Sequence, residues 1–166
     1  MHLPDMQHPP LAGNACECRL TYHDGTRRLV YCVDQEEPFP DGRLIVSRTN
    51  LGGFITHANE AFIAMSGYTV EELIGAPHHI LRHPEMPKAA FADLWTTIAS
   101  GKKWHGYVKN LRKDGLFYWV YATVIPNVRA GVVVSYTSVR RKPSRRKINE
   151  MSDLYTKMLS QERAAQ

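Results

Sequence analysis

Between residues 43 and 140, short apolar runs of strand length alternate with stretches that have helical spacing. The runs at 44–46 and 53–56 are separated by turn-forming asparagine and glycine, which predicts two short strands. Residues 59–65 have the spacing of a short helix. Residues 69–72 read Thr-Val-Glu-Glu, a capping box in which the threonine hydroxyl and the last glutamate each bind the other's backbone amide. This half of the segment therefore begins with two strands and continues as short helices.

A longer helix is predicted next. Pro77 and Pro84 break the preceding segment into short helical pieces, because proline lacks the amide that a helix interior needs. Pro87 suits the first turn of a helix that ends at Gly101. Its apolar face consists of Phe91, Leu94, Trp95 and Ile98.

Three strands are predicted to complete the segment, at 103–111, 116–125 and 131–140. Lys-Asp-Gly at 113–115 is a strong hairpin signal between the first two. The element order predicts an α+β domain with a five-stranded antiparallel sheet, short helices and one longer helix over one face. In the middle strand the inward set is Tyr118, Val120, Ala122 and Val124, and the outward set is Phe117, Trp119, Tyr121 and Thr123. So many outward aromatic side chains need a cover, and we expect the N-terminal extension or a second subunit to supply it.

The chain divides into three parts: an extension or cap at 1–42, the patterned domain at 43–140, and a basic linker with a signalling helix at 141–166. The extension contains five prolines and a short hairpin signal at 23–25, and its order is uncertain from sequence. The C-terminal helix is predicted over 144–162, with Ser144 as its cap. An a/d stripe along it predicts a weak homodimer, and the alternative is that the stripe packs on its own domain: Ile148, Met151, Tyr155 and Met158.

The distribution of charged residues, apolar runs, cysteines and histidines argues against several functions: broad nucleic-acid binding, membrane insertion and metal binding. The net charge is +5, but residues 140–147 hold six of the 21 basic residues, leaving 15 basic and 16 acidic residues elsewhere. A nucleic-acid-binding face spread over the fold is therefore not expected. No apolar run of membrane-spanning length and no signal peptide are visible, which makes the cytoplasm the expected compartment. A metal site is not expected, because neither of two candidate groups has a complete ligand set: Cys16, Cys18 and Cys32, and His78, His79 and His83.

Several motifs within 43–140 match a known family. The element order, the segments 59–62 and 66–75, and the Lys-Asp-Gly turn resemble a PAS domain. A more specific match covers 82–95, read Arg-His-Pro-Glu-Met-Pro-Lys-Ala-Ala-Phe-Ala-Asp-Leu-Trp. Together with 55–59, 77–78, Trp104-x-Gly-x-Val-Lys-Asn110 and 118–120, it resembles the FAD-binding PAS domain of bacterial aerotaxis receptors.

This resemblance implies a redox or oxygen sensor that binds FAD non-covalently and is not an enzyme. The downstream signalling domains would follow in the same chain, in a membrane-associated receptor. Arg82 would pair with the pyrophosphate, and its alternative is a structural pair with Glu85 or a turn carbonyl. Asn110 would meet the polar edge of the flavin ring from the strand face it shares with Trp104, and its alternative is an exposed position near the hairpin. At position 85 this chain has glutamate where the family pattern has aspartate. The cofactor-binding residues carried over are Asn59, Arg82, His83, Glu85, Phe91, Trp95, Trp104, Asn110 and Tyr118.

Other functions remain as alternatives at this stage. A haem-based sensor commonly has an axial histidine on the long helix, but residues 88–101 contain none. A blue-light receptor uses a cysteine beside the flavin, and residues 58–101 contain none. No nicotinamide fingerprint or nucleophile triad indicates a flavoenzyme. A PAS interaction module without a ligand is the remaining alternative.

Overall fold

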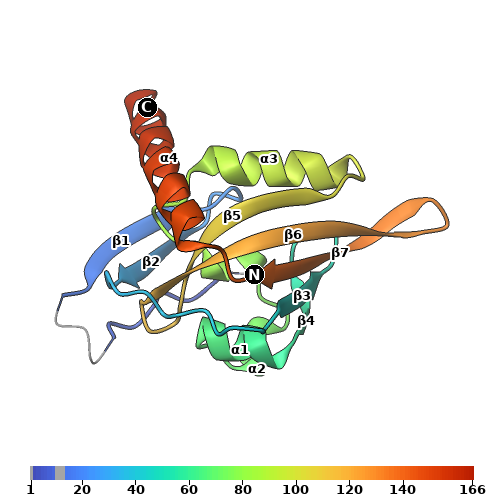
Figure 1. Ribbon diagram of the computed structural model, residues 1–166, viewed down its shortest axis with the longest axis horizontal. Coiled ribbons are helices and arrows are strands. Elements are labelled where there is room, and N and C mark those ends of the chain that lie inside the picture. The colour runs from blue at the N-terminus through green and yellow to red at the C-terminus, as the bar shows by residue number, and fades with distance from the viewer. Residues whose placement is uncertain (1, 10–13) are drawn as a thin grey trace.

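The computed structural model describes residues 2–9 and 14–166 and confirms the α+β fold (Figure 1). A five-stranded antiparallel sheet has the spatial order β4-β3-β7-β6-β5. The strands lie close to their predicted ranges, except that β6 runs on to Arg129, past its predicted end at residue 125, where an Ala-Gly turn with positive φ angles of 49° and 77° joins it to β7. Their bounds are β3 Ile45–Thr49, β4 Ile55–Ala58, β5 Trp104–Leu111, β6 Phe117–Arg129 and β7 Val132–Arg141.

Four helical segments connect β4 to β5 and provide one wall of the domain core. The capping box at Thr69 is confirmed: its hydroxyl accepts from the Glu72 amide at 3.2 Å, and the Glu72 carboxylate accepts from the Thr69 amide at 2.9 Å. The long helix starts after Pro87 and ends before Gly101, as predicted. The bounds are α1 Glu60–Ser66, α2 Val70–Leu73, the 3₁₀ helix η1 His78–Leu81 and α3 Lys88–Ala99.

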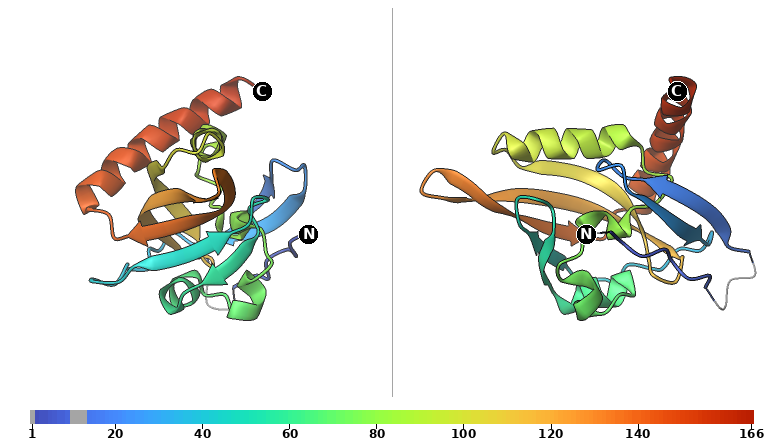
Figure 2. Two further views of the ribbon diagram at one scale, coloured as in Figure 1. Left: turned by 90° about the vertical axis from the view of Figure 1, so that its right-hand side faces the viewer. Right: turned by 180° about the vertical axis from the view of Figure 1, so that it is seen from behind.

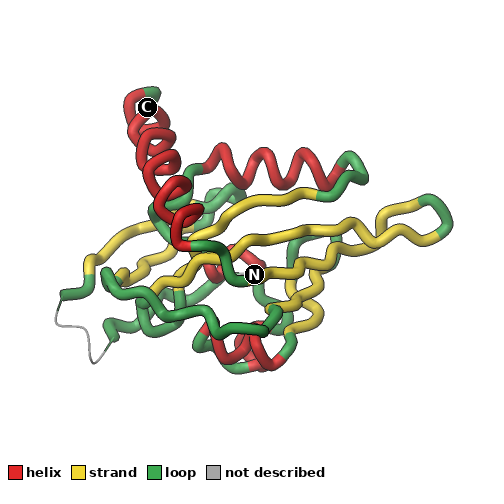
Figure 3. The backbone as a smooth tube through the Cα atoms, in the orientation of Figure 1, coloured by secondary structure: helices red, strands yellow, loops and turns green. Residues whose placement is uncertain are grey.

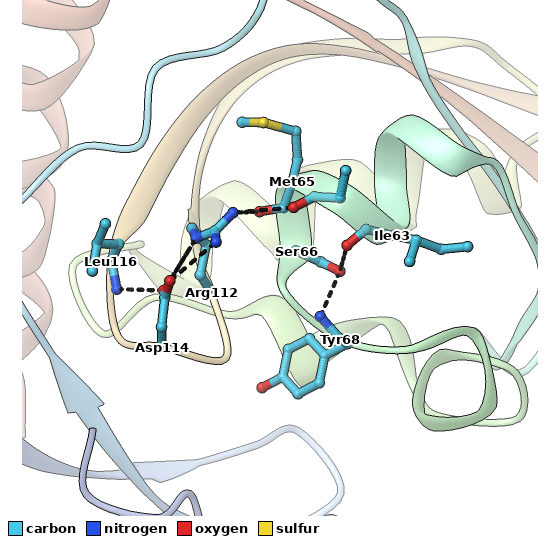
Figure 4. A network of polar contacts seen from close by, with 8 residues as sticks. Ile63, Met65, Ser66, Tyr68, Arg112, Asp114 and Leu116 are labelled. Atoms are coloured by element: carbon cyan, nitrogen blue, oxygen red, sulfur yellow. Dashed lines mark hydrogen bonds and ion pairs between the residues drawn. The ribbon is translucent and has the colours of Figure 1, made fainter. Parts of the chain in front are cut away.

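A polar network holds the end of α1 against the β5–β6 turn (Figure 4). The Arg112 guanidinium donates to the carbonyl of Met65 and forms a 3.0 Å ion pair with Asp114. On the other side of the turn after α1, the Ser66 hydroxyl accepts from the Tyr68 amide at 3.2 Å. The Arg112 bonds satisfy carbonyls that the helix leaves unpaired at its C-terminus, and the Ser66 bond fixes the backbone of Tyr68 after the helix.

The N-terminal extension is an ordered part of the fold over its described residues; residue 1 and residues 10–13 lie outside them. The predicted hairpin is confirmed as β1 Cys16–Thr21 and β2 Arg27–Cys32. The buried Arg28 ties it to the domain: its guanidinium donates to the carbonyls of Pro4 and Ile80 and to the Tyr68 hydroxyl, at 2.8, 3.1 and 3.2 Å. Between β2 and β3 the chain continues as a long loop along the sheet (Figure 3).

The outward aromatic face is covered mainly by the chain's own C-terminal helix, α4 Arg145–Ala164, which corrects the expected cover (Figure 2). The predicted cap is confirmed, because the Ser144 hydroxyl accepts from the Lys147 amide at 3.2 Å. All four stripe residues pack in one cluster with Trp119 of the sheet: Ile148, Met151, Tyr155 and Met158. The alternative packing is therefore the one observed, and a dimer through this stripe requires α4 to leave the sheet.

The basic segment also divides differently from the sequence prediction. Arg141, which the sequence placed in the linker, belongs with Arg140 to β7, and only Lys142 to Ser144 separate this strand from α4. Arg140 is 2% exposed and its side chain points into the core. Within the described part of the chain, no helix has the length and apolarity needed to cross a membrane.

Candidate cofactor cavity

A cavity of about 740 Å³ lies between α3 and the concave face of the sheet. The sheet side is apolar, with Val108 from β5 and Val120 and Ala122 from β6. The lining positions on α3 run from Lys88 to Ile98, which corresponds to about 15 Å along the helix at 1.5 Å per residue. The volume falls within the range of small-molecule sites, and the length suits an elongated ligand.

A buried cation stands at the inner end of this cavity. Arg140 lines it, and the guanidinium carbon is 4.5 Å from the centre of the Phe62 ring. Its Nη2 donates to the Ser47 hydroxyl, whereas its Nε has no hydrogen-bond partner among the described residues. Among those residues it also forms no ion pair with a carboxylate. Burial lowers the pKa of Arg140 to about 10, so the group remains charged at neutral pH.

His78 lies beside this arginine and supplies a neutral ring. Its Nε2 is 3.3 Å from the Ser47 hydroxyl and 3.5 Å from Nη1 of Arg140. Burial, together with the Arg140 charge, lowers the pKa of His78 to about 3. Because the arginine can only donate, a hydrogen bond between them makes Nε2 of His78 the acceptor and leaves the ring proton on Nδ1.

A second group of polar side chains lies nearer the start of α3. Arg82 and Asn110 are paired through their backbones as an isolated bridge, and both line the cavity. The Arg82 guanidinium lies 5.1 Å from the centre of the Phe91 ring, and its Nε has no partner among the described residues. The exposed Lys88 also lines this region. Two cations therefore lie around the same part of the cavity.

The structure brings four of the nine predicted cofactor-binding residues to the cavity wall: Arg82, Phe91, Trp95 and Asn110. Trp95 is 37% exposed and packs edge-on against Tyr136, with 6.1 Å between ring centres. Its ring also lies against Gly53, where a Cβ atom would approach it to 3.0 Å. A bulky side chain at Gly53 would therefore displace this ring.

Five predicted residues lie elsewhere: Asn59 and Trp104 have clear hydrogen-bond partners, and Tyr118 is buried in the core. Asn59 caps α1: its carboxamide oxygen accepts from the amides of Val46 and Phe62, each at 3.0 Å. The Trp104 indole nitrogen donates to Asp93 of α3 at 2.8 Å, which fastens this helix to β5. Tyr118 is fully buried in the core, and its hydroxyl has no partner among the described residues.

His83 and Glu85 are directed away from the cavity. His83 is buried, its Nδ1 accepts from the Glu85 amide at 3.1 Å, and burial lowers its pKa to about 3. The Glu85 side chain is 63% exposed and pairs with Lys109 on the outer face of β5. These two residues therefore shape the turn before α3 and do not line the cavity.

Sequence reasoning missed Arg140, His78 and the hairpin residue Tyr22 as lining residues. Arg140 ends the last predicted strand, but the basic run 140–147 that contains it gave no sign that its side chain is buried. His78 was considered as a metal ligand and as part of the matched segment 77–78, but it was not assigned to the cavity wall. All three cysteines lie in β1 and β2, and none lines the cavity.

Comparison with known proteins agrees with this architecture. Residues 55–140 match the PAS fold family. Over 125 residues, 75% of this chain, the sequence is 46% identical to the aerotaxis receptor of Escherichia coli strain K12. The match covers 25% of that receptor, so the chain spans about a quarter of its length.

Solved structures show the same fold. The crystal structure of the PAS domain of a Colwellia psychrerythraea protein is 25% identical, with a TM-score of 0.55, over 60% of this chain and 86% of that one. The dark structure of the blue-light photoreceptor Aureochrome1 LOV is 22% identical, with a TM-score of 0.59, over 71% and 86%. From its fold, its cavity and the matched residues, the chain belongs to the PAS domain family.

Proposed function

We propose that this domain binds FAD non-covalently in the cavity and acts as a redox or oxygen sensor for chemotaxis-type signalling. The main support for this proposal is Arg140, a buried cation that has no carboxylate partner among the described residues. It lines a long and largely apolar cavity. Such a charge is costly unless a ligand supplies acceptors for it. The similarity to an aerotaxis receptor supports the sensory role.

The residues around Arg140 fit a flavin ring. The valine and alanine side chains of β5 and β6 offer a flat apolar surface, and Asn110, which lies farther along β5 beside Arg82, would offer both a donor and an acceptor to the polar edge of the ring. When bound, a flavin supplies reversible transfer of electrons and protons. Arg140 would stabilise negative charge that develops on the ring, and the neutral His78 would hold the guanidinium in place. The apolar walls would keep water from this end of the cavity.

The residues nearer the start of α3 fit the phosphates. Arg82 offers a planar pair of donors to phosphate oxygens, and Lys88 adds a second positive charge. Neither residue forms an ion pair with a carboxylate among the described residues. These two cations would neutralise much of the charge of a pyrophosphate.

A route for the signal passes through α3. Phe91 lines the cavity and also packs against the cluster of Trp119 and Tyr155 that holds α4 on the sheet. A displacement of Phe91 on flavin reduction would therefore change how α4 packs. Signalling segments that follow in the same chain would receive this change, and a homodimer of such receptors remains a prediction.

The absorption spectrum of the purified protein, incubated with FAD and desalted, tests the proposal. We expect the two flavin bands in the blue and near ultraviolet and release of FAD on acid treatment. A protein that stays colourless would overturn the assignment of FAD. A Soret band would show that the cofactor is haem and not FAD. Arg140→Gln should weaken FAD binding at least tenfold and lower the midpoint potential, because it removes a positive charge. The exposed Arg48→Gln is the matched control.

A further inference from the structure

Residues at the turn of the N-terminal hairpin line one end of the cavity. Residues 21–24, at the end of β1 and in the turn that follows it, are among the lining residues, together with His79 of η1. This hairpin precedes residues 55–140, the segment that matches the PAS family. The chain therefore completes the cavity with a part that the family match does not include.

Three aromatic rings make this end of the cavity. Tyr22 stacks on His79 with 4.0 Å between ring centres and 12° between the planes. His23 approaches His79 edge-on at 5.7 Å. Tyr22 is only 4% exposed, and its buried hydroxyl lies beside the Arg28 guanidinium. An aromatic surface of this kind suits a flat heterocycle.

The hairpin is held firmly enough to shape a site. Arg28 fixes its second strand to Pro4, Ile80 and Tyr68. The turn itself is closed by a 2.9 Å bond from the Tyr22 amide to the Thr26 carbonyl. The Asp24 carboxylate also accepts from the Thr26 amide and hydroxyl. The three rings are therefore preorganised before any ligand enters.

We propose that the hairpin is a dinucleotide-recognition element in which Tyr22, His23 and His79 bind the adenosine end of FAD. This inference rests on the proposed function. The deep part of the cavity fits the flavin ring, and Arg82 with Lys88 fits the phosphates. FMN ends at its phosphate, so only the dinucleotide has a further group to place against these rings. Purine bases stack on such aromatic side chains.

The experiment compares the binding of FAD and FMN, measured by quenching of flavin fluorescence. We expect wild-type protein to bind FAD at least tenfold more tightly than FMN. Tyr22→Ala and the exposed His23→Ala should weaken FAD binding severalfold and leave FMN binding unchanged. Tyr31→Ala is the matched control, since Tyr31 lies in the same hairpin but does not line the cavity. Thermal unfolding of each ligand-free variant checks the fold.

The outcomes separate the two proposals. If wild-type protein binds neither flavin, the proposed function itself is wrong. If it binds FAD but the variants keep the full preference over FMN, the hairpin role is wrong while the function stands. Equal weakening of FAD and FMN would assign the hairpin to general support of the cavity, which also overturns recognition of adenosine.

Discussion

The Glu162 carboxylate, near the end of α4, accepts a hydrogen bond from the backbone amide of Ala89 in the first turn of α3, over 3.0 Å. It also accepts from the Lys88 amide at 3.2 Å. The N-cap position of α3 is Pro87, whose side chain forms no capping bond. The C-terminal helix therefore caps the helix that lines the cavity, and the acidic charge complements the helix dipole.

Removing this cap is expected to destabilise the protein modestly. Glu162→Ala should lower the free energy of unfolding by about 0.5–1 kcal/mol, and Glu162→Gln by less, because glutamine keeps an acceptor. Urea unfolding measures both. Glu150→Ala is the matched control, since Glu150 pairs with Lys147 in the same helix and with no other cation among the described residues. An equal loss in the control would show that the contact with α3 contributes nothing of its own.

Disrupting the packing of α4 on the sheet should lower the free energy of unfolding more than removing the Glu162 cap does. Tyr155 is 6% exposed, stacks on Trp119 with 6.1 Å between ring centres, and donates its hydroxyl to the Tyr107 carbonyl at 2.6 Å. Tyr155→Ala should cost about 3 kcal/mol of unfolding free energy, whereas Leu154→Ala should stay within about 0.5 kcal/mol, because Leu154 is 46% exposed.

Sedimentation of the same variants decides whether the a/d stripe of α4 packs on its own sheet or on a second subunit. With α4 on its own sheet, Tyr155→Ala should lower stability and leave any self-association unchanged. If it instead dissociates a dimer without a loss of stability, the stripe lies between subunits, as its heptad spacing first suggested.

Local rules in the sequence predicted much of the fold. The capping box at Thr69, the proline start of α3, the Lys-Asp-Gly turn and the Ser144 cap all occur as expected, because each depends on neighbouring residues alone. The prediction of what covers Trp119 was wrong, because the apolar spacing of α4 is the same whether the helix packs on a partner helix or on its own sheet. Only tertiary packing distinguishes the two.

The cavity was less accessible to sequence reasoning. Trp95 and Asn110 were found through a family resemblance, and both line the cavity, while their contact with a cofactor stays a prediction. Arg140 was hidden in a run of basic residues, since charge content does not reveal which arginine a strand turns inward. Tyr22 lies more than fifty residues before η1, and nothing in the sequence pairs it with His79.

The cysteines are expected to differ sharply in reactivity. Cys16 is exposed, whereas burial raises the pKa of the Cys32 thiol to about 12. Because the thiolate is the reactive form, iodoacetamide at pH 8 should modify Cys16 first and leave Cys32 largely unmodified in the folded protein. Mass spectrometry of peptides over time measures both, and urea-unfolded protein should show equal labelling. Early modification of Cys32 would show that the hairpin opens.

Lowering the pH should reduce the free energy of unfolding already at pH values above those at which carboxylates titrate. Burial lowers the pKa of His83 to about 3 from its usual 6.5, so folding favours the neutral ring. The unfolded chain binds the proton more tightly, and stability is therefore complete above pH 6.5 and is lost as pH falls toward 3. Between pH 6.5 and 5 this one residue should remove about 2 kcal/mol of unfolding free energy.

Urea unfolding at several pH values between 5 and 7.5 measures the slope of the unfolding free energy against pH. His83→Asn should reduce this slope by the contribution of one histidine. Asparagine retains an acceptor for the Glu85 amide, so the slope can be read even where the variant is less stable overall. His78 and His79, whose pKa values burial lowers to about 3 and about 4, should produce the slope that remains. An identical slope in His83→Asn would mean that the His83 ring takes up its proton without unfolding.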